Sequence, residues 1–395
     1  MPASKISSPS SDRIELVDAL RGYALLGLLL VHCVERFELY WLDPQPDAWF
    51  DGVFALFGGK SFAIFALLFG FGFATIMANY RRRDIDFTWR FAWRVTLLFA
   101  IGTLHALIYR GDILQVLALL GLLLIPLDRI SSNRILAILA ALLLIQVPLL
   151  AQSVLAGNGS TAAQTPPYFL GDTGLSVLAQ GSFTDVLTVN AQGGMVGKWS
   201  FYLSTGRIVE ICGLFAIGML LQRKKAFMNL PQSRLKWSLA LAVSGLTWLV
   251  LDRYGPGLLP PWPDQGGAPM QAQSVGWALD SWRTGAATAF QIAVFVLLWQ
   301  TPVHAVLRWF APPGRMTLTF YVLQSLVSVP LFYGFGSGLW DDWSTAQTVL
   351  AGLVFFALQI VAATWWYRHF RYGPLEWTWR AMTLGDRNIP IRRSK

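Results

Sequence analysis

The chain has 395 residues, of which 54% are hydrophobic and 14% aromatic, whereas only 13% are charged. A soluble globular protein carries about 25% charged residues, so this composition excludes an ordinary soluble enzyme. Apolar runs of about 20 residues recur, which predicts an all-α, polytopic bundle of membrane helices. The net charge of +9 raises the question of nucleic-acid binding. However, the basic residues lie in short loops between apolar runs, as membrane topology alone predicts, so we expect no nucleic-acid partner.

The apolar runs predict about ten transmembrane helices within a single domain, residues 18–380. A leader, residues 1–17, precedes it and a basic tail, residues 381–395, follows it. Two outer connections are long, 152–198 and 252–276, and act either as lids of a site or as plain connectors. The predicted spans cover residues 20–40, 52–79, 91–109, 112–127, 133–153, 199–222, 236–251, 276–299, 316–336 and 346–367.

The basic residues also predict the orientation. Lys and Arg concentrate in alternate connections, such as 80–94 and 222–236, and in the tail. The intervening segments 43–51 and 336–344 carry acidic residues and no Lys or Arg. Because cytoplasmic loops carry the excess of positive charge, both termini are predicted to be cytoplasmic.

The first apolar run carries an arginine and a histidine on one face. Arg21 and His32 are eleven residues apart, which in a helix leaves them about 20° from alignment and about 16 Å apart along the axis. Arg94 and His105 repeat this spacing in the third run. With the predicted orientation, each pair has its arginine toward the cytoplasm and its histidine toward the outside. Ionisable groups inside a membrane are costly and indicate function by default, although a buried histidine is often purely structural.

The chemistry available at these positions is acid–base catalysis rather than metal catalysis. No metal-binding motif, phosphate-binding glycine loop or Gly-x-Ser-x-Gly motif occurs in the sequence. The cysteines, Cys33 and Cys212, lie in apolar runs and indicate neither a disulfide framework nor a metal site. Histidine titrates near neutrality and can remove a proton from a hydroxyl or amine, and arginine can bind phosphate or an oxyanion.

Several stretches resemble the YeiB-type bacterial inner-membrane proteins, a family of unknown function, and they occur in that family's order over nearly the whole chain. The most distinctive are Gly-Arg-Met at 314–316 and Gly-Pro-Leu-Glu-Trp at 373–377; the others are Val-Asp-Ala-Leu-Arg-Gly at 17–22, Phe-Ala-Leu-Leu-Phe-Gly at 65–70 and Gly-Thr-Leu-His at 102–105. More remotely, that family is similar to transmembrane acyltransferases, namely acyltransferase family 3 and heparan-α-glucosaminide N-acetyltransferase. Arg21 and His32 match an Arg-x10-His pattern of the former.

The resemblance implies a multi-pass protein of the bacterial inner membrane that transfers an acyl group from cytoplasmic acyl-CoA, with acetyl-CoA first among the donors, to an outer acceptor. The acceptor would be a sugar or another small molecule with a hydroxyl or amine group. Membrane lipids and a second copy of the chain are further expected partners, and no metal is expected. The predicted donor-binding residues are Asp18, Arg21, Arg94 and Arg315.

Either His32 or His105 is predicted to be the general base, with Asp112 or Glu35 orienting the imidazole. YeiB-type proteins often have Asn at the position of His32, which leaves the choice between the two histidines open. Arg207 and Glu210 are three residues apart and can simply neutralise each other. The candidate substrate-binding residues are Lys60, Arg110, Arg207, Glu210 and Gln324.

Two other functions fit the same residues. Intramembrane charges and long outer connections also suit a secondary transporter or exporter of a small polar or lipid-linked molecule, although no inverted repeat is evident. The third reading is a non-catalytic membrane sensor or scaffold, which predicts no acyl-CoA binding and tolerance of changes at the histidines and arginines.

Overall fold

A computed structural model describes residues 14–45, 47–160, 174–228, 230–259, 270–386 and 388–393. Over these residues the chain is helical and no strand forms, apart from an isolated bridge between Phe370 and Arg392. The predicted all-α class is therefore confirmed. Most of the leader and the middle of both long connections lie outside the described residues.

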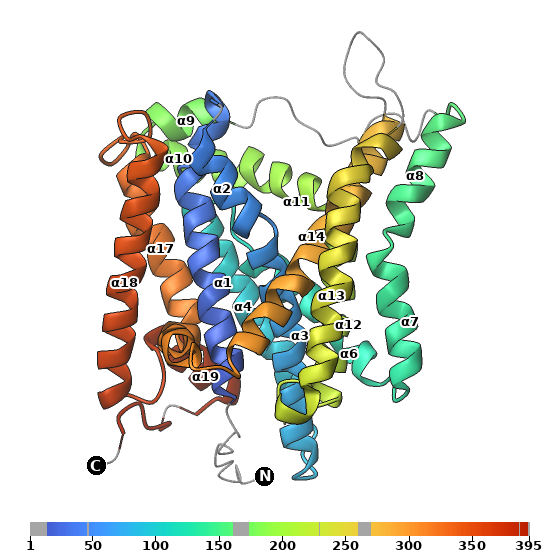
Figure 1. Cartoon of the computed structure of the whole chain (residues 1–395). Coiled ribbons are helices and arrows are strands. Elements are labelled where there is room, and N and C mark those ends of the chain that lie inside the picture. Colours follow the sequence, from blue (N-terminus) through green and yellow to red (C-terminus); the bar gives the residue numbers. More distant parts are fainter. Residues whose placement is uncertain are drawn as a thin grey trace.

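The helices follow one another with short breaks (Figure 1). The first half contains α1 (Glu15–Val34), η1 (Leu39–Leu42), α2 (Ala48–Phe57), α3 (Lys60–Arg81), α4 (Thr88–Ile108), α5 (Leu114–Gly121), α6 (Leu124–Asp128), α7 (Asn133–Leu144), α8 (Val147–Gly157), α9 (Leu175–Gln180), α10 (Phe183–Val189) and the π-helical turn η3 (Asn190–Gly194). The second half contains α11 (Met195–Ser204), α12 (Arg207–Arg223), α13 (Leu230–Tyr254), η4 (Gly255–Leu258), α14 (Met270–Leu298), α15 (His304–Leu307), η5 (Arg308–Phe310), α16 (Ala311–Arg315), α17 (Thr317–Phe332), α18 (Thr345–His369) and α19 (Pro374–Leu384).

Within the described residues, seven helical segments are long and apolar enough to cross a membrane, so the chain is a multi-pass membrane protein. An eighth is added if α10–α11 and α12, which meet at a bend of 66°, count as one broken span. The predicted number of ten and the cytoplasmic placement of the termini remain predictions. The seven segments are Glu15–Leu42, Ala48–Arg81, Thr88–Ile108, Asn133–Gly157, Leu230–Leu258, Met270–Leu298 and Thr345–His369.

Three of the predicted spans are divided, bent or shortened in the structure. The run 112–127 is divided into α5 and α6, which have only 8 and 5 residues. The run 199–222 bends before α12, where Gly206 has a positive φ of 71° that favours glycine. The run 316–336 gives the 16-residue α17, which contains Pro330 in its last turn, where the missing amide hydrogen removes one helical bond.

Helix α1 forms the centre of the bundle, and α13 lies at its periphery. In the most apolar 18-residue stretch of α1 and η1, 78% of the residues are buried, whereas in that of α13 and η4 only 11% are buried. Figure 1 shows α1 between α18 and the α3–α14 region, with α7 and α8 at one edge. A side chain on α1 therefore faces protein, and polar residues there need partners or a polar cavity.

The long connection 152–198 is more regular than its composition predicts. Its described part forms the end of α8 and then α9, α10, η3 and the start of α11. Ser182 caps α10 by accepting from Asp185 N, and the Asp185 carboxylate accepts from Ser182 N in return. In Figure 1, α9 and α10 lie at the end of the bundle opposite α19, beside the last turn of α1.

Candidate active site

A cavity of about 280 Å³ lies near the N-terminal ends of α1 and α4 and the start of α17, and we call it the arginine cavity. It is lined by Arg21, Arg94 and Arg315, three of the four residues predicted to bind the donor. Its remaining walls are mostly aromatic and aliphatic, including Phe69 and Leu98. It is therefore a mainly apolar slot with three cationic groups at its edge.

Asp18, the fourth predicted donor residue, lies behind this cavity and connects two of its arginines. Its buried carboxylate accepts from Arg21 Nη1 and from Arg315 Nε, each at 3.2 Å. This contact needs close backbones, because a Cβ at Gly314 would lie 1.8 Å from the Asp18 carbonyl oxygen. The distant Leu-Arg-Gly and Gly-Arg-Met stretches of the sequence thus meet at one point.

Helix α19 closes the arginine cavity from the side. The Arg94 guanidinium stacks 3.5 Å from the ring centroid of Trp379, and Trp379 Nε1 donates to the Arg94 carbonyl oxygen at 2.8 Å. Glu376 also lines the cavity and accepts from Thr319 N and Oγ1. Burial raises the pKa of the Glu376 carboxyl, and the hydrogen bonds from Thr319 oppose that rise.

A larger cavity, about 520 Å³, lies toward the C-terminal ends of α1 and α4, and we call it the histidine cavity. Its polar lining comes from α1, the α4–α5 turn, α11 and α12. Its apolar lining is largely aromatic. The polar residues are His32, Glu35, Glu38, Tyr109, Arg110, Lys198, Ser200, Tyr202 and Arg207, and the aromatic ones include Trp41, Phe54, Phe57, Phe62 and Phe201.

His32 is held by two neighbours at the wall of the histidine cavity. Its Nδ1 forms a 2.8 Å hydrogen bond with the Tyr109 hydroxyl and lies 3.6 Å from Glu35 Oε2. Its Nε2 is buried and has no hydrogen-bond partner among the described residues. Glu35 is further engaged by Trp41 Nε1, which donates to it at 3.2 Å.

His105 forms a buried pair with Asp112. Its Nδ1 lies 2.8 Å from Asp112 Oδ1, and the second oxygen of Asp112 accepts from Gln115 N at 2.9 Å. An ionised carboxylate only accepts, so Nδ1 is the nitrogen that donates in this contact, and in the neutral ring Nε2 is then the nitrogen with the lone pair. That Nε2 has no hydrogen-bond partner among the described residues.

The His105 pair lies in the partition between the two cavities. Ile113, next to Asp112, lines both cavities. The ring of His105 packs against Tyr321, which lines the arginine cavity, at 5.3 Å, and against Tyr109, which lines the histidine cavity, at 6.3 Å. Neither His105 nor Asp112 is itself among the residues that line the two cavities, so the pair lies behind their walls, next to side chains that do line them.

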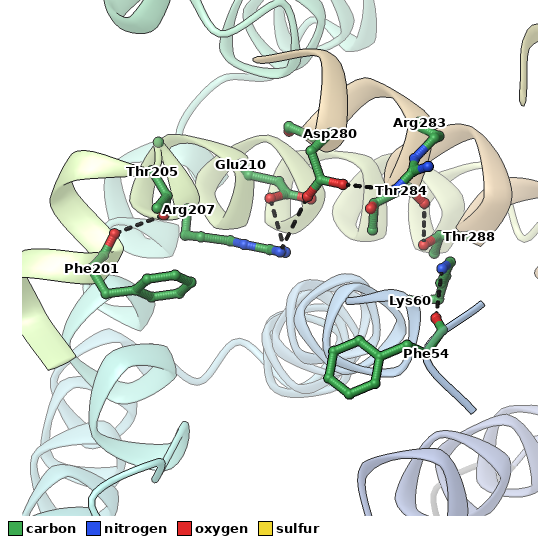
Figure 2. Close-up of polar contacts among 12 residues, drawn as sticks. Phe54, Lys60, Phe201, Thr205, Arg207, Glu210, Asp280, Arg283, Thr284 and Thr288 are labelled. Carbon is green, nitrogen blue, oxygen red and sulfur yellow. Dashed lines mark hydrogen bonds and ion pairs between the residues drawn. The ribbon is translucent and has the colours of Figure 1, made fainter. Parts of the chain in front are cut away.

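The predicted substrate-binding residues fall in two places. Arg110 and Arg207 line the histidine cavity, where Arg110 Nε donates to Glu38 at 2.6 Å. Figure 2 shows the Arg207 guanidinium directed at the carboxylates of Glu210 and Asp280, 3.4 and 3.8 Å away. The mutual neutralisation of Arg207 and Glu210 that the sequence allowed is thus the observed arrangement.

Lys60 and Gln324 are not among the residues that line the two cavities. Lys60 Nζ donates to the Phe54 carbonyl oxygen at 3.1 Å (Figure 2). Gln324 is buried between α17 and α18, where its Nε2 donates to Gln359 at 3.0 Å. For Gln324 this contact indicates a structural role between helices.

Several polar residues of the site were not predicted from the sequence, among them Tyr109, Tyr321, Glu38 and Lys198. Tyr109 directly precedes Arg110, a predicted substrate-binding residue, so its position was the available signal. Lys198 lies within Gly-Gly-Met-Val-Gly-Lys at 193–198, in a connection without apolar periodicity. No group of three or more His, Cys, Asp or Glu that could hold a metal gathers among the residues described.

The described part of the chain is thus a helical membrane bundle with a buried His–Asp pair next to two cavities. Residues 13–169 match the model of the heparan-alpha-glucosaminide N-acetyltransferase catalytic domain, and residues 221–386 match that of DUF418, a protein family of unknown function. The predicted resemblance to the YeiB-type family and to the transmembrane acetyltransferases is therefore confirmed. The first match supports an acetyltransferase-like function.

Three bacterial relatives match over almost their whole length. The uncharacterized protein YxaH of Bacillus subtilis is 27% identical, with 95% of each chain covered. An uncharacterized 39.9 kDa protein of Bacillus acidopullulyticus is 26% identical, with 97% of each covered. The uncharacterized protein YeiB of Escherichia coli is 28% identical, with 94% of this chain and 97% of YeiB covered.

Proposed function

We propose that the protein is a membrane-bound acyltransferase that moves an acyl group from cytoplasmic acyl-CoA to an acceptor on the other side of a bacterial inner membrane. The observation that supports this proposal is the buried His105–Asp112 pair, whose imidazole packs against Tyr109 of the histidine cavity and Tyr321 of the arginine cavity. The match to an N-acetyltransferase catalytic domain makes acetyl-CoA the first donor to test.

The arginine cavity binds the donor in this proposal. Arg21, Arg94 and Arg315 bind the phosphate groups of CoA near the bundle end, and the apolar walls surround the acyl-bearing arm. Arg94 and His105 are on the same helix, eleven residues apart, so the arm spans about 16 Å from the arginines to the imidazole.

The chemical step uses His105 as general base. Nε2 removes a proton from the acceptor hydroxyl or amine, and the freed oxygen or nitrogen attacks the thioester carbonyl carbon. The carbon–sulfur bond then breaks, and the imidazolium returns the proton to the CoA thiolate. Asp112 keeps the hydrogen on Nδ1 and stabilises the transient positive charge of the ring.

The histidine cavity binds the acceptor, a small molecule or glycan. Aromatic walls such as Trp41 and Phe62 provide flat contact surface for a sugar or similar ring. His32 and Tyr109 lie between this space and His105 and orient the attacking group. His32 is therefore a positioning residue in this proposal, and His105 is the base.

The test measures CoA release from acetyl-CoA by the purified protein in proteoliposomes, with glucose, glucosamine and glycerol as acceptor probes. We expect acceptor-dependent release that falls by about 10²–10⁴-fold in His105→Gln. His304→Gln is the matched control, because His304 is exposed and lies outside both cavities. Equal release by His105→Gln and the unaltered protein would overturn the proposal.

The same preparation separates the transporter alternative. A transporter moves a labelled probe across the vesicle membrane without acetylating it, and its flux does not require acetyl-CoA. Mass spectrometry of the recovered probe therefore decides between the two functions.

A further inference from the structure

Lys198 is a buried cation without an assigned task. It lies on α11 and lines the histidine cavity, and only 8% of its surface is exposed. Its Nζ is fully buried and has no hydrogen-bond partner among the described residues. Removing a charged ammonium from water without a hydrogen-bonded partner costs several kcal/mol. The carboxylates whose charge acts on Lys198, Asp112 and Glu38, are already engaged by His105 and Arg110. An anionic ligand would therefore complete the surroundings of this ammonium.

The other charged groups of the cavity already have partners. Arg110 donates to Glu38, and Arg207 lies against Glu210. Glu35 accepts from Trp41 and faces His32. These contacts engage the carboxylates of Glu35 and Glu38 with other side chains, so Lys198 Nζ stays without a hydrogen-bond partner among the described residues at the wall of the cavity.

The backbone beside Lys198 leaves room for a ligand. Gly193 and Gly197 line the cavity, and a Cβ at either would meet no atom within 4 Å. The π-helical turn η3 that carries Gly193 is fixed by Asn190, whose Nδ2 donates to the carbonyl oxygens of Leu107 and Ile108 at the end of α4. Single π-helical turns often occur at functional sites.

We propose that Lys198 is the anion-binding residue of the histidine cavity and that the acceptor carries a carboxylate or phosphate group. That the bound anion is the acceptor depends on the proposed acyl transfer, whereas anion binding at Lys198 does not depend on it. Lys198 Nζ donates charge-assisted hydrogen bonds to the anion. The glycine face of η3 and α11 lets the rest of the ligand approach the backbone, and the aromatic walls enclose it.

The site is tested by protection of a cysteine placed beside it. Gly197→Cys puts a thiol in the open space next to Lys198, and the parent chain, whose Cys33 and Cys212 are buried, gives the background. The rate of thiol labelling is measured in phosphatidylcholine nanodiscs with sodium phosphate, sodium acetate or sodium chloride at equal ionic strength. A parallel arm uses phosphatidylglycerol nanodiscs, which present the phosphate as a lipid headgroup.

We expect phosphate, acetate or the anionic lipid to slow labelling about tenfold relative to chloride in phosphatidylcholine. Which probe protects identifies the source of the anion. Protection is lost when Lys198→Met is added and kept with Lys198→Arg. Lys236→Met is the matched control, because Lys236 is an exposed lysine of α13 outside both cavities.

Each variant is compared only with itself, with and without probe, so a changed thiol reactivity does not affect the result. If Lys198→Met fails to fold, Lys198→Gln replaces it. Absence of protection by every anionic probe, or equal protection in the Met variant, overturns the proposal. Because no acyl transfer is measured, this result is independent of whether the chain is an acyltransferase.

Discussion

The two cavities hold their charged groups in different ways. In the arginine cavity Asp18 fixes Arg21 and Arg315, and Trp379 stacks on Arg94. In the histidine cavity and its partition, His32 Nε2, His105 Nε2 and Lys198 Nζ lack hydrogen-bond partners among the residues described. The first cavity is preorganised around fixed positive charges, which suits one constant ligand. The second has polar atoms that a reacting ligand must satisfy.

The largest effect, a loss of kcat, is expected when each of the two histidines is substituted separately. His105→Gln removes the only base whose Nδ1 is held by a carboxylate within hydrogen-bond distance in the described part of the chain, and kcat should fall by about 10²–10⁴-fold. His32→Gln keeps the His105–Asp112 pair, so kcat should fall about tenfold or less while KM for the acceptor rises. Steady-state kinetics with acceptor varied distinguish the two. If kcat falls more in His32→Gln than in His105→Gln, His32 is the base and His105 the positioning residue.

The next effect is on stability at the arginine cavity. Asp18→Ala leaves Arg21 and Arg315 without their shared carboxylate. Breaking a buried pair costs about 3–5 kcal/mol, and we expect about 3 kcal/mol because the two arginine side chains are 29% and 26% exposed. The unfolding temperature in detergent reports this loss. An unchanged unfolding temperature would mean that the two arginines are not held by Asp18.

These two sites also differ in how far the sequence predicts them. The helical spacing predicts that Arg21 and His32 share a face, and they do line cavities at opposite ends of α1. The contacts that define the chemistry join residues far apart in sequence, such as His32 with Tyr109 and Asp18 with Arg315. Spacing along one helix contains no information about these contacts, because helix packing determines them.

The same limit explains why the contacts of some predicted residues, and some residues of the site, could not be anticipated from the sequence. Gln324 resembles a substrate ligand because it is polar within an apolar run, but Gln359 of a neighbouring helix satisfies it. In the sequence Lys198 resembles an ordinary loop lysine, whereas in the structure it lies on α11 and lines the histidine cavity. The division of 112–127 into α5 and α6 likewise depends on a local break that mean hydropathy does not register.

A smaller effect is expected from weakening the stacked arginine. Arg94→Lys keeps a positive charge but loses the planar group that stacks on Trp379 at 3.5 Å. A cation–π contact contributes about 0.5–2 kcal/mol, so KM for acetyl-CoA should rise about three- to tenfold with kcat nearly unchanged. Equal KM values would mean that the guanidinium does not contact the donor.

The smallest effect should come from the basic segment beyond the cavities. Arg81 pairs with Asp128, but its side chain is 65% exposed and it does not line the arginine cavity. Exposed ion pairs contribute about 0–1 kcal/mol, so Arg81→Gln should change the unfolding temperature slightly and KM for acetyl-CoA less than about twofold at physiological ionic strength, where exposed charges are screened. A tenfold rise in KM would extend the donor site to this loop. If KM for acetyl-CoA is unchanged in Arg81→Gln but rises in Arg94→Lys, the arginines that line the arginine cavity bind the donor. Membrane topology alone would then account for the positive charge around Arg81.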